Sequence, residues 1–426
     1  MAGLAVAPWV TSGVRAASPN GKLRHAAFGI GDMGTGDLNA LSSHPMLEVV
    51  ALCEVDSRRL VAMKQRFPQA TCYRDWRELL DKEGARIDSV NVSTPDHLHG
   101  PIGLTAMALG KHLYGQKPLA QNLDECRQMM LRAREKKVVT QMGIQVSANV
   151  NERTAVALIR QGAIGKIKEV HSWSSKKWGD MGPVPVRQDQ VPPELDWDLW
   201  QGPADPRPYL NGYYHPVEWR RRRDFGTGTL GDMGCHIFSA WFRALDLATP
   251  TTVRSSGPAP LNATNWANNG AVEYSFKGTA NTATDGVKVM WYEGDVRLPA
   301  EVLAAAGGRL SDEGSVFIGT EGVILFPHGG GPLLFPKEKF KNHPMPKVQT
   351  SDHYHEFIDC CLTGKGKPGA NFDIAGPLTE TVLLGCVASP FPGAILKWDS
   401  AALKFTNHPE ADKLIKRNYR KGWKPA

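Results

Sequence analysis

The sequence has few features that would indicate covalent or metal cross-links. Its seven cysteines are odd in number and none belongs to a Cys-x-x-Cys pair, so neither a disulfide framework nor a zinc site is indicated. We predict that the cysteines are small buried residues and that no metal is bound. Beyond the N-terminal segment no run approaches the roughly 18 apolar residues of a membrane span, which predicts a soluble protein without a membrane partner.

The sequence has no long segment in which basic or acidic residues are strongly clustered. The 50 basic and 43 acidic residues give a net charge of +7 that is spread along the chain, whereas a nucleic-acid-binding protein clusters its basic residues in a stripe. We therefore expect no nucleic-acid partner. With 426 residues, of which 42% are hydrophobic, the chain can bury a full core, and its length indicates two domains.

A short apolar run that breaks into glycines is the most informative feature present. In KLRHAAFGIGDMG, Gly29, Gly31 and Gly34 follow the pattern G-x-G-x-x-G. After a buried strand, such glycines permit a tight turn, a close approach of the backbone to a pyrophosphate and close packing of the next helix, whose N-terminus favours phosphate. The turn predicts a dinucleotide site with Asp32 and Met33 beside the cofactor.

The next apolar run ends in a carboxylate that bears on the choice of cofactor. Glu54 lies about 25 residues after Gly29, close to the separation expected for a residue that binds ribose hydroxyls. A carboxylate repels a 2′-phosphate, so we predict NAD and regard NADP as the alternative. Arg58 and Arg59 support that alternative if a guanidinium receives the phosphate, although arginines facing solvent at the start of a helix are the simpler interpretation.

The pattern of apolar residues divides the chain into parts. Residues 22–147 alternate short strands with helical stretches, which predicts an α/β Rossmann domain with a doubly wound parallel sheet. Residues 148–426 show alternation and β-branched residues between Gly/Pro-rich loops, which predicts an α+β domain with a large open-faced, mostly antiparallel sheet, C-terminal helices and a basic aromatic tail. Residues 1–21 resemble the second half of an export signal without its charged start and are interpreted as a remnant or a flexible tail.

This N-terminal segment sets the expected location. If it is the remnant of a signal, the protein is exported or periplasmic, and the twin-arginine route would suit a folded nucleotide-binding protein; otherwise the protein is cytoplasmic. No twin arginine occurs in the segment.

Side chains that follow later strands are further candidates for the dinucleotide site, because open sheets of this type bind ligands at the carboxyl ends of their strands. One group lies in SVNVSTPDHLH, where the two histidines are expected near the mouth of the site, and the other in KHLYGQKP. The predicted contacts are Thr94, Pro95, His97, His99, Gln116 and Lys117.

A second patch, GTGTLGDMGCHIFSAWFRAL, carries candidate catalytic groups. Asp232 and His236 stand four residues apart at the start of a predicted helix and therefore share one face. Alternatives remain, since Asp232 could be a helix N-cap, His236 a core histidine and Lys117 a surface lysine.

Together these motifs resemble the Gfo/Idh/MocA oxidoreductases, the glucose-fructose oxidoreductase and inositol dehydrogenase family. The glycine turn, a Lys-Pro step after the fourth strand, TPDHLH, GTLGDMGCH and a closing YRKGW carry the resemblance, and WDLWQGP and AGPLTETVLLG resemble its longer, exported branch. The resemblance implies a sugar held between the two domains against the nicotinamide.

The same resemblance implies roles for three residues, in that Lys117, Asp232 and His236 match the lysine, aspartate and histidine of the family. Oxidation of a secondary alcohol needs a base for the hydroxyl proton, which suits His236. Lys117 can stabilise alkoxide charge, and Asp232 can bind a neighbouring hydroxyl or hold the lysine.

Two positions depart from the family pattern. Gln116 stands where the family usually has glutamate, which removes a negative charge near the nicotinamide, and Ser239 stands where relatives often have aspartate, which is expected to alter sugar contacts. The Lys117–Pro118 bond is a candidate cis peptide that would aim the lysine.

Aromatic side chains crowd the region before the predicted catalytic helix, and aromatic faces suit pyranose rings, although packing explains about half of them. The run from Arg220 to Arg223 is interpreted as a solvated or inter-subunit patch, whereas one arginine that reaches inward would favour an anionic sugar such as a uronate or sulfated unit. The predicted substrate contacts are Trp178, Tyr213, Tyr214, His215, Trp219, Arg220, Asp232, His236, Trp291 and Tyr292.

Three functions remain open at this point. The first is an NAD(P)-dependent oxidoreductase of a sugar or cyclic polyol. The second is a glycoside hydrolase that retains its nicotinamide and oxidises the sugar transiently, with Tyr213 or His215 as an extra acid or base. The third is a non-catalytic carbohydrate- or dinucleotide-binding protein. In each the partner is a small carbohydrate or glycoside, and an exposed sheet face predicts a homodimer or homotetramer.

Overall fold

The computed structural model describes residues 21–425. The interpretation of residues 1–21 therefore falls, apart from Gly21, outside the described residues. Within residues 21–425 no helix is both long and apolar enough to cross a membrane.

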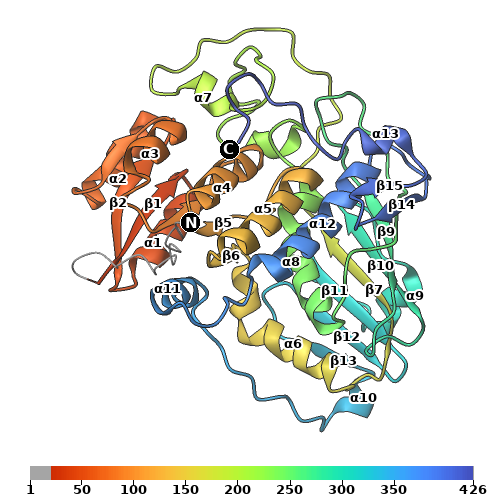
Figure 1. Cartoon of the computed structure of the whole chain (residues 1–426). Helices are drawn as coiled ribbons and strands as arrows, with labels where there is room; N and C mark the ends of the chain where they lie inside the picture. The colour runs from red at the N-terminus through yellow and green to blue at the C-terminus, as the bar shows by residue number, and fades with distance from the viewer. Residues whose placement is uncertain (1–20, 426) are drawn as a thin grey trace, which may run out of the picture.

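The first unit is a six-stranded parallel sheet in the order β3-β2-β1-β4-β5-β6. Helices pack on both faces of this sheet, and a separate apolar cluster lies between the helices and the sheet on each face, as predicted for a doubly wound sheet (Figure 1). The elements up to its junction with the second unit are β1 (Leu23–Phe28), α1 (Met33–Ser42), β2 (Leu47–Cys53), α2 (Ser57–Arg66), β3 (Thr71–Tyr73), α3 (Trp76–Glu83), β4 (Ser89–Val92), η1 (Asp96–Leu98), α4 (His99–Ala108), β5 (His112–Gly115), α5 (Leu123–Lys136), β6 (Thr140–Met142), η2 (Gln145–Ala148) and α6 (Val150–Arg160).

The second unit is a nine-stranded sheet in the order β13-β12-β11-β7-β10-β9-β8-β14-β15. Only the pair β7 and β10 is parallel, so the sheet is mostly antiparallel, as predicted. Its elements are β7 (Ile167–Ser174), α7 (Trp197–Gln201), η3 (Glu218–Arg221), α8 (Gly228–Ala244), β8 (Thr252–Ser255), β9 (Ala271–Lys277), β10 (Gly286–Glu293), α9 (Ala300–Ala305), β11 (Glu313–Gly319), β12 (Val323–Pro327), β13 (Leu333–Phe335), α10 (Lys337–Phe340), α11 (His353–Thr363), α12 (Phe372–Ala388), β14 (Leu396–Asp399), β15 (Lys404–Phe405) and α13 (Pro409–Asp412).

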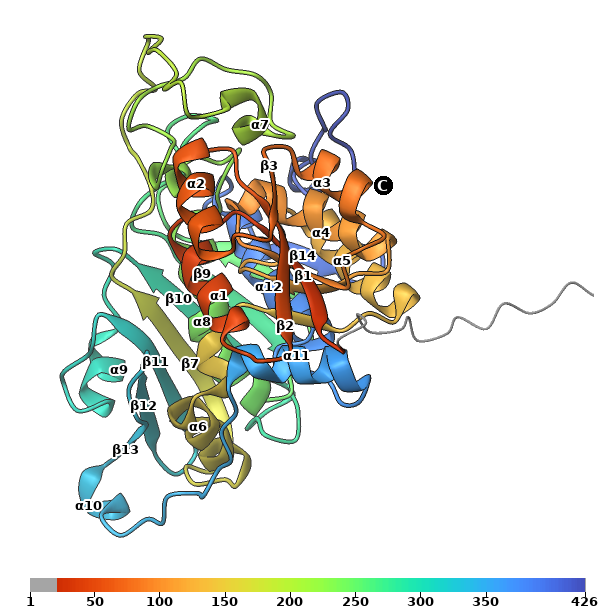
Figure 2. The ribbon, with the colours of Figure 1, turned by 90° about the vertical axis from the view of Figure 1, so that its left-hand side faces the viewer.

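The two faces of the second sheet are covered differently. Helices α8 and α12 pack on the inner face and join it to the core of the first unit. The outer face holds a smaller apolar cluster beneath α9, so it is covered in part (Figure 2). Successive residues of a strand point to opposite faces, which places Trp291 against Phe238 of α8 and Tyr292 on the outer face.

Three pieces of the later chain return to the first unit. Helix α11 packs on α1 and β1. The closing tail binds α5, because Arg417 and Tyr419 contact Glu125 at 3.0 and 2.6 Å. Residues 175–227, the aromatic segment, extend across the top of both units in Figure 1 and pair with the loop after β2 through Leu195 and Asp56.

Candidate active site

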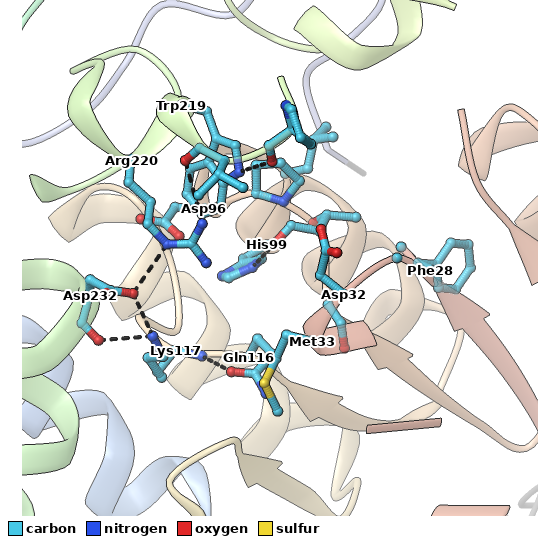
Figure 3. A pocket seen from close by; sticks show the side chains of 18 of the residues that line it. Phe28, Asp32, Met33, Asp96, His99, Gln116, Lys117, Trp219, Arg220 and Asp232 are labelled. Carbon is cyan, nitrogen blue, oxygen red and sulfur yellow. Dashed lines mark hydrogen bonds and ion pairs between the residues drawn. The ribbon is translucent and has the colours of Figure 1, made fainter. Parts of the chain in front are cut away.

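A cavity of about 520 Å³ lies at the carboxyl ends of β1, β2, β4 and β5 and is closed by α8 and the aromatic segment. This is the edge at which a doubly wound sheet binds ligands. Figure 3 shows Asp32 and Met33 on one side of the cavity and Lys117 and Asp232 on the other. Both the predicted dinucleotide residues and the predicted catalytic residues therefore face one space.

The glycine turn after β1 leaves no room for side chains. Gly29 has φ of +74°, and a Cβ there would lie 2.8 Å from the carbonyl oxygen of Ser93. A Cβ at Gly34 would lie 2.0 Å from the carbonyl oxygen of Gly29. A Cβ at Gly31 would meet the guanidinium of Arg59, which bridges the turn through an ion pair of 3.0 Å with Asp32. The third glycine thus lets α1 start directly against the strand, as the sequence predicted.

Glu54 lines the cavity at the end of β2 and is fixed by two backbone amides. The N–H groups of Ile30 and Asp56 donate to its two oxygens, each at 3.1 Å. Burial raises the pKa of Glu54, while these amides oppose the shift. Arg58 pairs with Asp56 and Glu194 at 2.9 and 2.8 Å and does not line the cavity.

The four predicted residues after β4 differ in position. Thr94, Pro95 and His99 line the cavity, and the two ring nitrogens of His99 lie 2.7 and 2.8 Å from the carbonyl oxygens of Thr94 and Pro118. His97 does not line the cavity, contrary to its predicted contact. It is fully buried behind the cavity wall, where Nε2 bonds the carbonyl oxygen of Trp200, and burial lowers its pKa to about 3.

Lys117 and Asp232 form an ion pair across the domain junction. The Lys117 peptide to Pro118 is cis, and Nζ lies 2.9 Å from Oδ1 of Asp232 and 2.8 Å from its carbonyl oxygen. Trp178 donates to the other carboxylate oxygen at 2.8 Å. Burial would raise the pKa of Asp232, but Lys117 and Arg220 outweigh it and hold the pKa below its usual range. Asp232 is therefore ionised and is more than a helix cap.

His236 lines the same cavity one helical turn after Asp232. Burial, assisted by the charge of Lys117, lowers its pKa well below the ordinary value, so the imidazole is neutral. Among the described residues no group hydrogen-bonds its buried Nδ1. The ring of His328, which follows β12, lies 5.7 Å from the ring of His236. A neutral, unpaired imidazole in the cavity has the properties of a proton acceptor.

Gln116 and Ser239, the two departures from the family pattern, lie in different environments. Gln116 lines the cavity and its amide donates to Asp37 of α1 at 2.8 Å. Ser239 is fully buried on α8 and donates to Glu152 at 2.6 Å, outside the cavity. The expectation that Ser239 alters sugar contacts is wrong, because it points into the packing between α8 and α6.

Only part of the predicted aromatic wall faces the cavity. Trp178, His215, Trp219 and Arg220 line it. His215 lies toward the ribose end, 3.8 Å from Asp56, and its burial, with the charge of Arg59, lowers its pKa to about 4.

Tyr213 and Tyr214 do not line the cavity, because they pack inside the aromatic cluster of residues 175–227. The predicted roles of Trp291 and Tyr292 are also not supported. Trp291 lies in the core against α8, and Tyr292 is bonded to His171 on the outer face of the sheet.

The arginine run is not a solvated patch. Arg220 enters the cavity. Arg221 donates to the carbonyl oxygen of Gly179, Arg222 is buried and pairs with Asp180 at 2.6 Å, and Arg223 lies over the ring of Trp266. Each arginine has an internal partner of its own, so the interpretation as a solvated patch was wrong, while an inter-subunit contact stays a prediction.

Several residues of the cavity were not predicted. Lys176 extends from the end of β7 and Glu313 from β11, and the two side chains are 3.8 Å apart. Asp96 accepts a bond of 2.6 Å from Thr227, and burial raises its pKa. Lys176 and Glu313 lie at or near strand ends, which was the available signal, whereas nothing local distinguished His328. The structure shows no cluster of three potential metal ligands within residues 21–425.

Fold and cavity together define a two-unit protein with an NAD-binding Rossmann domain. The chain belongs to the Gfo/Idh/MocA oxidoreductase family: residues 23–144 match its NAD-binding Rossmann fold and residues 157–425 its C-terminal alpha/beta domain.

Relatives with known names are distant. Levoglucosan dehydrogenase of Pseudarthrobacter phenanthrenivorans is 26% identical over 297 residues, or 66% of this chain and 65% of that protein. An alpha-N-acetylgalactosaminidase of Shewanella oneidensis is 29% identical over 158 residues, or 34% of this chain and 33% of that protein. The alignments thus span less than two thirds of either relative.

Solved structures share the fold at low identity. The WlbA dehydrogenase of Bordetella pertussis, solved with NADH and UDP-GlcNAcA, has a TM-score of 0.62 and 14% identity and covers 89% of this chain and 99% of its own. The aldose-aldose oxidoreductase of Caulobacter crescentus has a TM-score of 0.57 and 18% identity and covers 88% and 100%.

Proposed function

We propose that the protein is an NAD-dependent oxidoreductase that acts on a secondary alcohol of a sugar or cyclic polyol. A single observation carries the proposal. One cavity holds the glycine turn and Glu54 at one end and Lys117, Asp232 and His236 at the other. A dehydrogenase needs this arrangement, because the cofactor ring and the proton acceptor must reach the same carbon and its hydroxyl.

The dinucleotide end of the cavity fits NAD. Gly29 and Gly31 line the cavity without side chains of their own, and the hydroxyl of Thr94 is buried without a hydrogen-bond partner among the described residues. The two oxygens of Glu54 suit ribose hydroxyls and disfavour a 2′-phosphate. When bound, NAD supplies the acceptor for the hydride.

The other end of the cavity supplies the proton chemistry. His236 takes the proton of the substrate hydroxyl, because its lowered pKa keeps the ring neutral. Lys117 stabilises negative charge on the resulting oxygen. Asp232 holds Nζ of Lys117 through two oxygens, at 2.9 and 2.8 Å, and so positions the charge.

The test is to incubate the purified protein with NAD and a panel of free sugars and cyclic polyols and to measure NADH by absorbance. We expect net NADH with at least one substrate and none with the His236→Gln variant. Failure of every sugar and polyol, with NAD demonstrably bound, would contradict the proposal.

A second function is favoured by the way the aromatic segment, residues 175–227, lies over the end of the cavity that contains Glu54. The amides of Ser57 and Asp196 pair with Glu194 and Val55 at 3.0 and 3.1 Å, so the aromatic segment is attached to the loop that follows Glu54. NAD held beneath this attachment would leave slowly, as a glycoside hydrolase that uses NAD transiently requires. The relative that is an alpha-N-acetylgalactosaminidase agrees with this choice.

In that reaction the sugar is oxidised to a ketone, the neighbouring C–H proton becomes acidic, and the aglycone leaves by elimination. Water then adds and the ketone is reduced by the same cofactor, so that NADH does not accumulate. Release of aglycone from aryl glycosides, with NAD(H) retained through dialysis, would establish this function. Rapid loss of NAD(H) on dialysis would contradict it.

Two further proposals concern the location and assembly of the protein. Export is supported by the signal-like composition of residues 1–21, and detection of the natural protein only in the cytoplasm would contradict it.

A homodimer or homotetramer is supported by the partly covered outer face of the second sheet, where Met290 and Glu273 are half-exposed. Light scattering on the purified protein measures the number of subunits.

A further inference from the structure

We infer that Arg220 recognises an anionic group on the substrate, which makes the substrate a uronic acid or a sulfated sugar. The inference rests on the proposed function and specifies its substrate class. It starts from one side chain that leaves the arginine run and enters the cavity (Figure 3).

Two tryptophans hold this guanidinium in place. Its carbon lies 4.3 Å from the ring centre of Trp219 and 5.5 Å from that of Trp178. Stacking on aromatic rings leaves the edge of a guanidinium available for hydrogen bonds and reduces the conformational entropy that a ligand must remove. Arg220 is therefore positioned to bind a carboxylate or sulfate group.

The internal bonds of Arg220 leave donors for a ligand. Nε contacts Asp232 at 3.3 Å and Nη1 contacts the carbonyl oxygen of Val217 at 3.5 Å, both at the long end of hydrogen-bond distances. Within residues 21–425, Nη2 has no hydrogen-bond partner. A carboxylate or sulfate oxygen in the cavity can accept from it.

Asp232 has two cationic partners besides Arg220. Lys117 lies 2.9 Å from its carboxylate and Lys176 lies 3.7 Å away, so three cations surround one carboxylate. Glu313 balances Lys176 at 3.8 Å. Asp96, another carboxyl group of the cavity, accepts a hydrogen bond from Thr227, and burial raises its pKa. The two histidines add no charge, because burial lowers the pKa of both His236 and His328. A substrate anion would therefore meet Arg220 without displacing a tight ion pair.

The test compares binding of matched sugars to the NAD-loaded protein. D-Glucuronate is paired with D-glucose, D-galacturonate with D-galactose, and glucose 6-sulfate serves as the sulfated probe. Trp178 and Trp219 line the cavity, so quenching of tryptophan fluorescence reports binding without turnover. We expect at least one anionic probe to bind about tenfold or more tightly than its neutral partner, with an affinity that falls as salt is raised.

Variants assign this preference to Arg220. Arg220→Met should lower the ratio of anionic to neutral affinity about tenfold, and Arg220→Lys should restore part of it, because it keeps the charge without the planar fork. The matched control is Arg221→Met, which removes a neighbouring guanidinium that is absent from the cavity lining and should keep the ratio. If Arg220→Met does not fold, Arg220→Lys and the salt dependence test the same point.

The outcomes separate the inference from the proposed function. Equal affinity for anionic and neutral sugars, or an unchanged preference in Arg220→Met, overturns the inference even where neutral sugars reduce NAD. A preference that depends on Arg220 without any NADH or aglycone supports the inference and contradicts the proposed activity. Preference for the uronates or for the sulfate identifies the anionic group.

Discussion

The amide nitrogen of Gln116 lies 2.8 Å from Oδ2 and 3.1 Å from Oδ1 of Asp37. Ser93 and Tyr354 donate to the same carboxylate at 2.7 and 2.9 Å. Burial raises the pKa of Asp37, while these three donors oppose the shift. The family usually has a negatively charged residue at position 116. In this protein the carboxylate is on Asp37 of α1, in hydrogen-bond contact with Gln116.

Exchange of the two side chains tests this relationship. Gln116→Glu places a second carboxylate against Asp37 and removes a buried hydrogen bond, so we expect a loss of about 2 kcal/mol in the free energy of unfolding. The double variant Asp37→Asn/Gln116→Glu restores one donor and one carboxylate and should recover most of that loss. Denaturant unfolding with NAD titration measures both, and additive effects of the two substitutions would refute the coupling.

Alanine substitutions at two glycines near the turn should affect NAD affinity differently. In Gly34→Ala the new Cβ would lie 2.0 Å from the carbonyl oxygen of Gly29, so we expect the NAD affinity to fall at least tenfold. Gly36→Ala lies on the same helix and its nearest neighbour would be 3.9 Å away. This control should bind NAD like the parent, and calorimetric titration distinguishes the two. Parental affinity in Gly34→Ala would show that α1 does not approach the strand as described.

The pH dependence of turnover reports on His236. Burial lowers its pKa well below the ordinary value, so the base form persists as the pH falls and turnover should show no loss between about pH 8 and pH 6 from this group. His236→Gln should lower kcat about 100-fold or more with little effect on NAD affinity. An acid limb with a midpoint near 6.5 that disappears in His236→Gln would contradict the lowered pKa.

Glu293 predicts a pH dependence of stability. Burial raises its pKa from 4.5 to about 7. The folded state therefore holds a proton that the unfolded state loses above about pH 4.5, and the free energy of unfolding should decrease as the pH rises from about 4.5 to 7. Glu293→Gln should remove about 2 kcal/mol of this decrease. The exposed Glu301→Gln serves as control, and equal slopes in both variants would be the contrary result.

The closing tail should contribute to stability. Trp423 is buried, and Arg77 of α3 lies over its ring at 4.0 Å. Trp423→Ala removes this packing and should cost about 3 kcal/mol in the free energy of unfolding. Lys424→Ala changes an exposed neighbour and should have little effect. Thermal unfolding of both variants measures this contribution. A Trp423→Ala protein as stable as the parent would mean that the tail does not pack on α3 as described.

Features that depend on neighbours in the sequence were predictable. The turn at Gly29, the carboxylate at Glu54 and the placement of Asp232 and His236 on one helix face follow from local rules of strand, turn and helix. The doubly wound sheet and the mostly antiparallel second sheet also follow, because their periodicities differ along the chain.

Features that depend on contacts between distant parts of the chain were not predictable. An alternating strand pattern places Trp291 and Tyr292 on opposite faces but does not say that one face meets α8 and the other α9. The sequence does not distinguish the four consecutive arginines from one another. In the structure their partners lie on separate loops, and of the four only Arg220 lines the cavity.

The sequence by itself determined that a strand, a glycine turn and a helix would form a dinucleotide site, since each part is specified within a few residues. Only the tertiary structure decided that Asp37 stands beside Gln116, that His328 joins His236 and that Arg220 faces Lys117 and Asp232. These groups are separated by about a dozen to about a hundred residues, and their distances are set by how the two sheets and the aromatic segment pack, which no local pattern encodes.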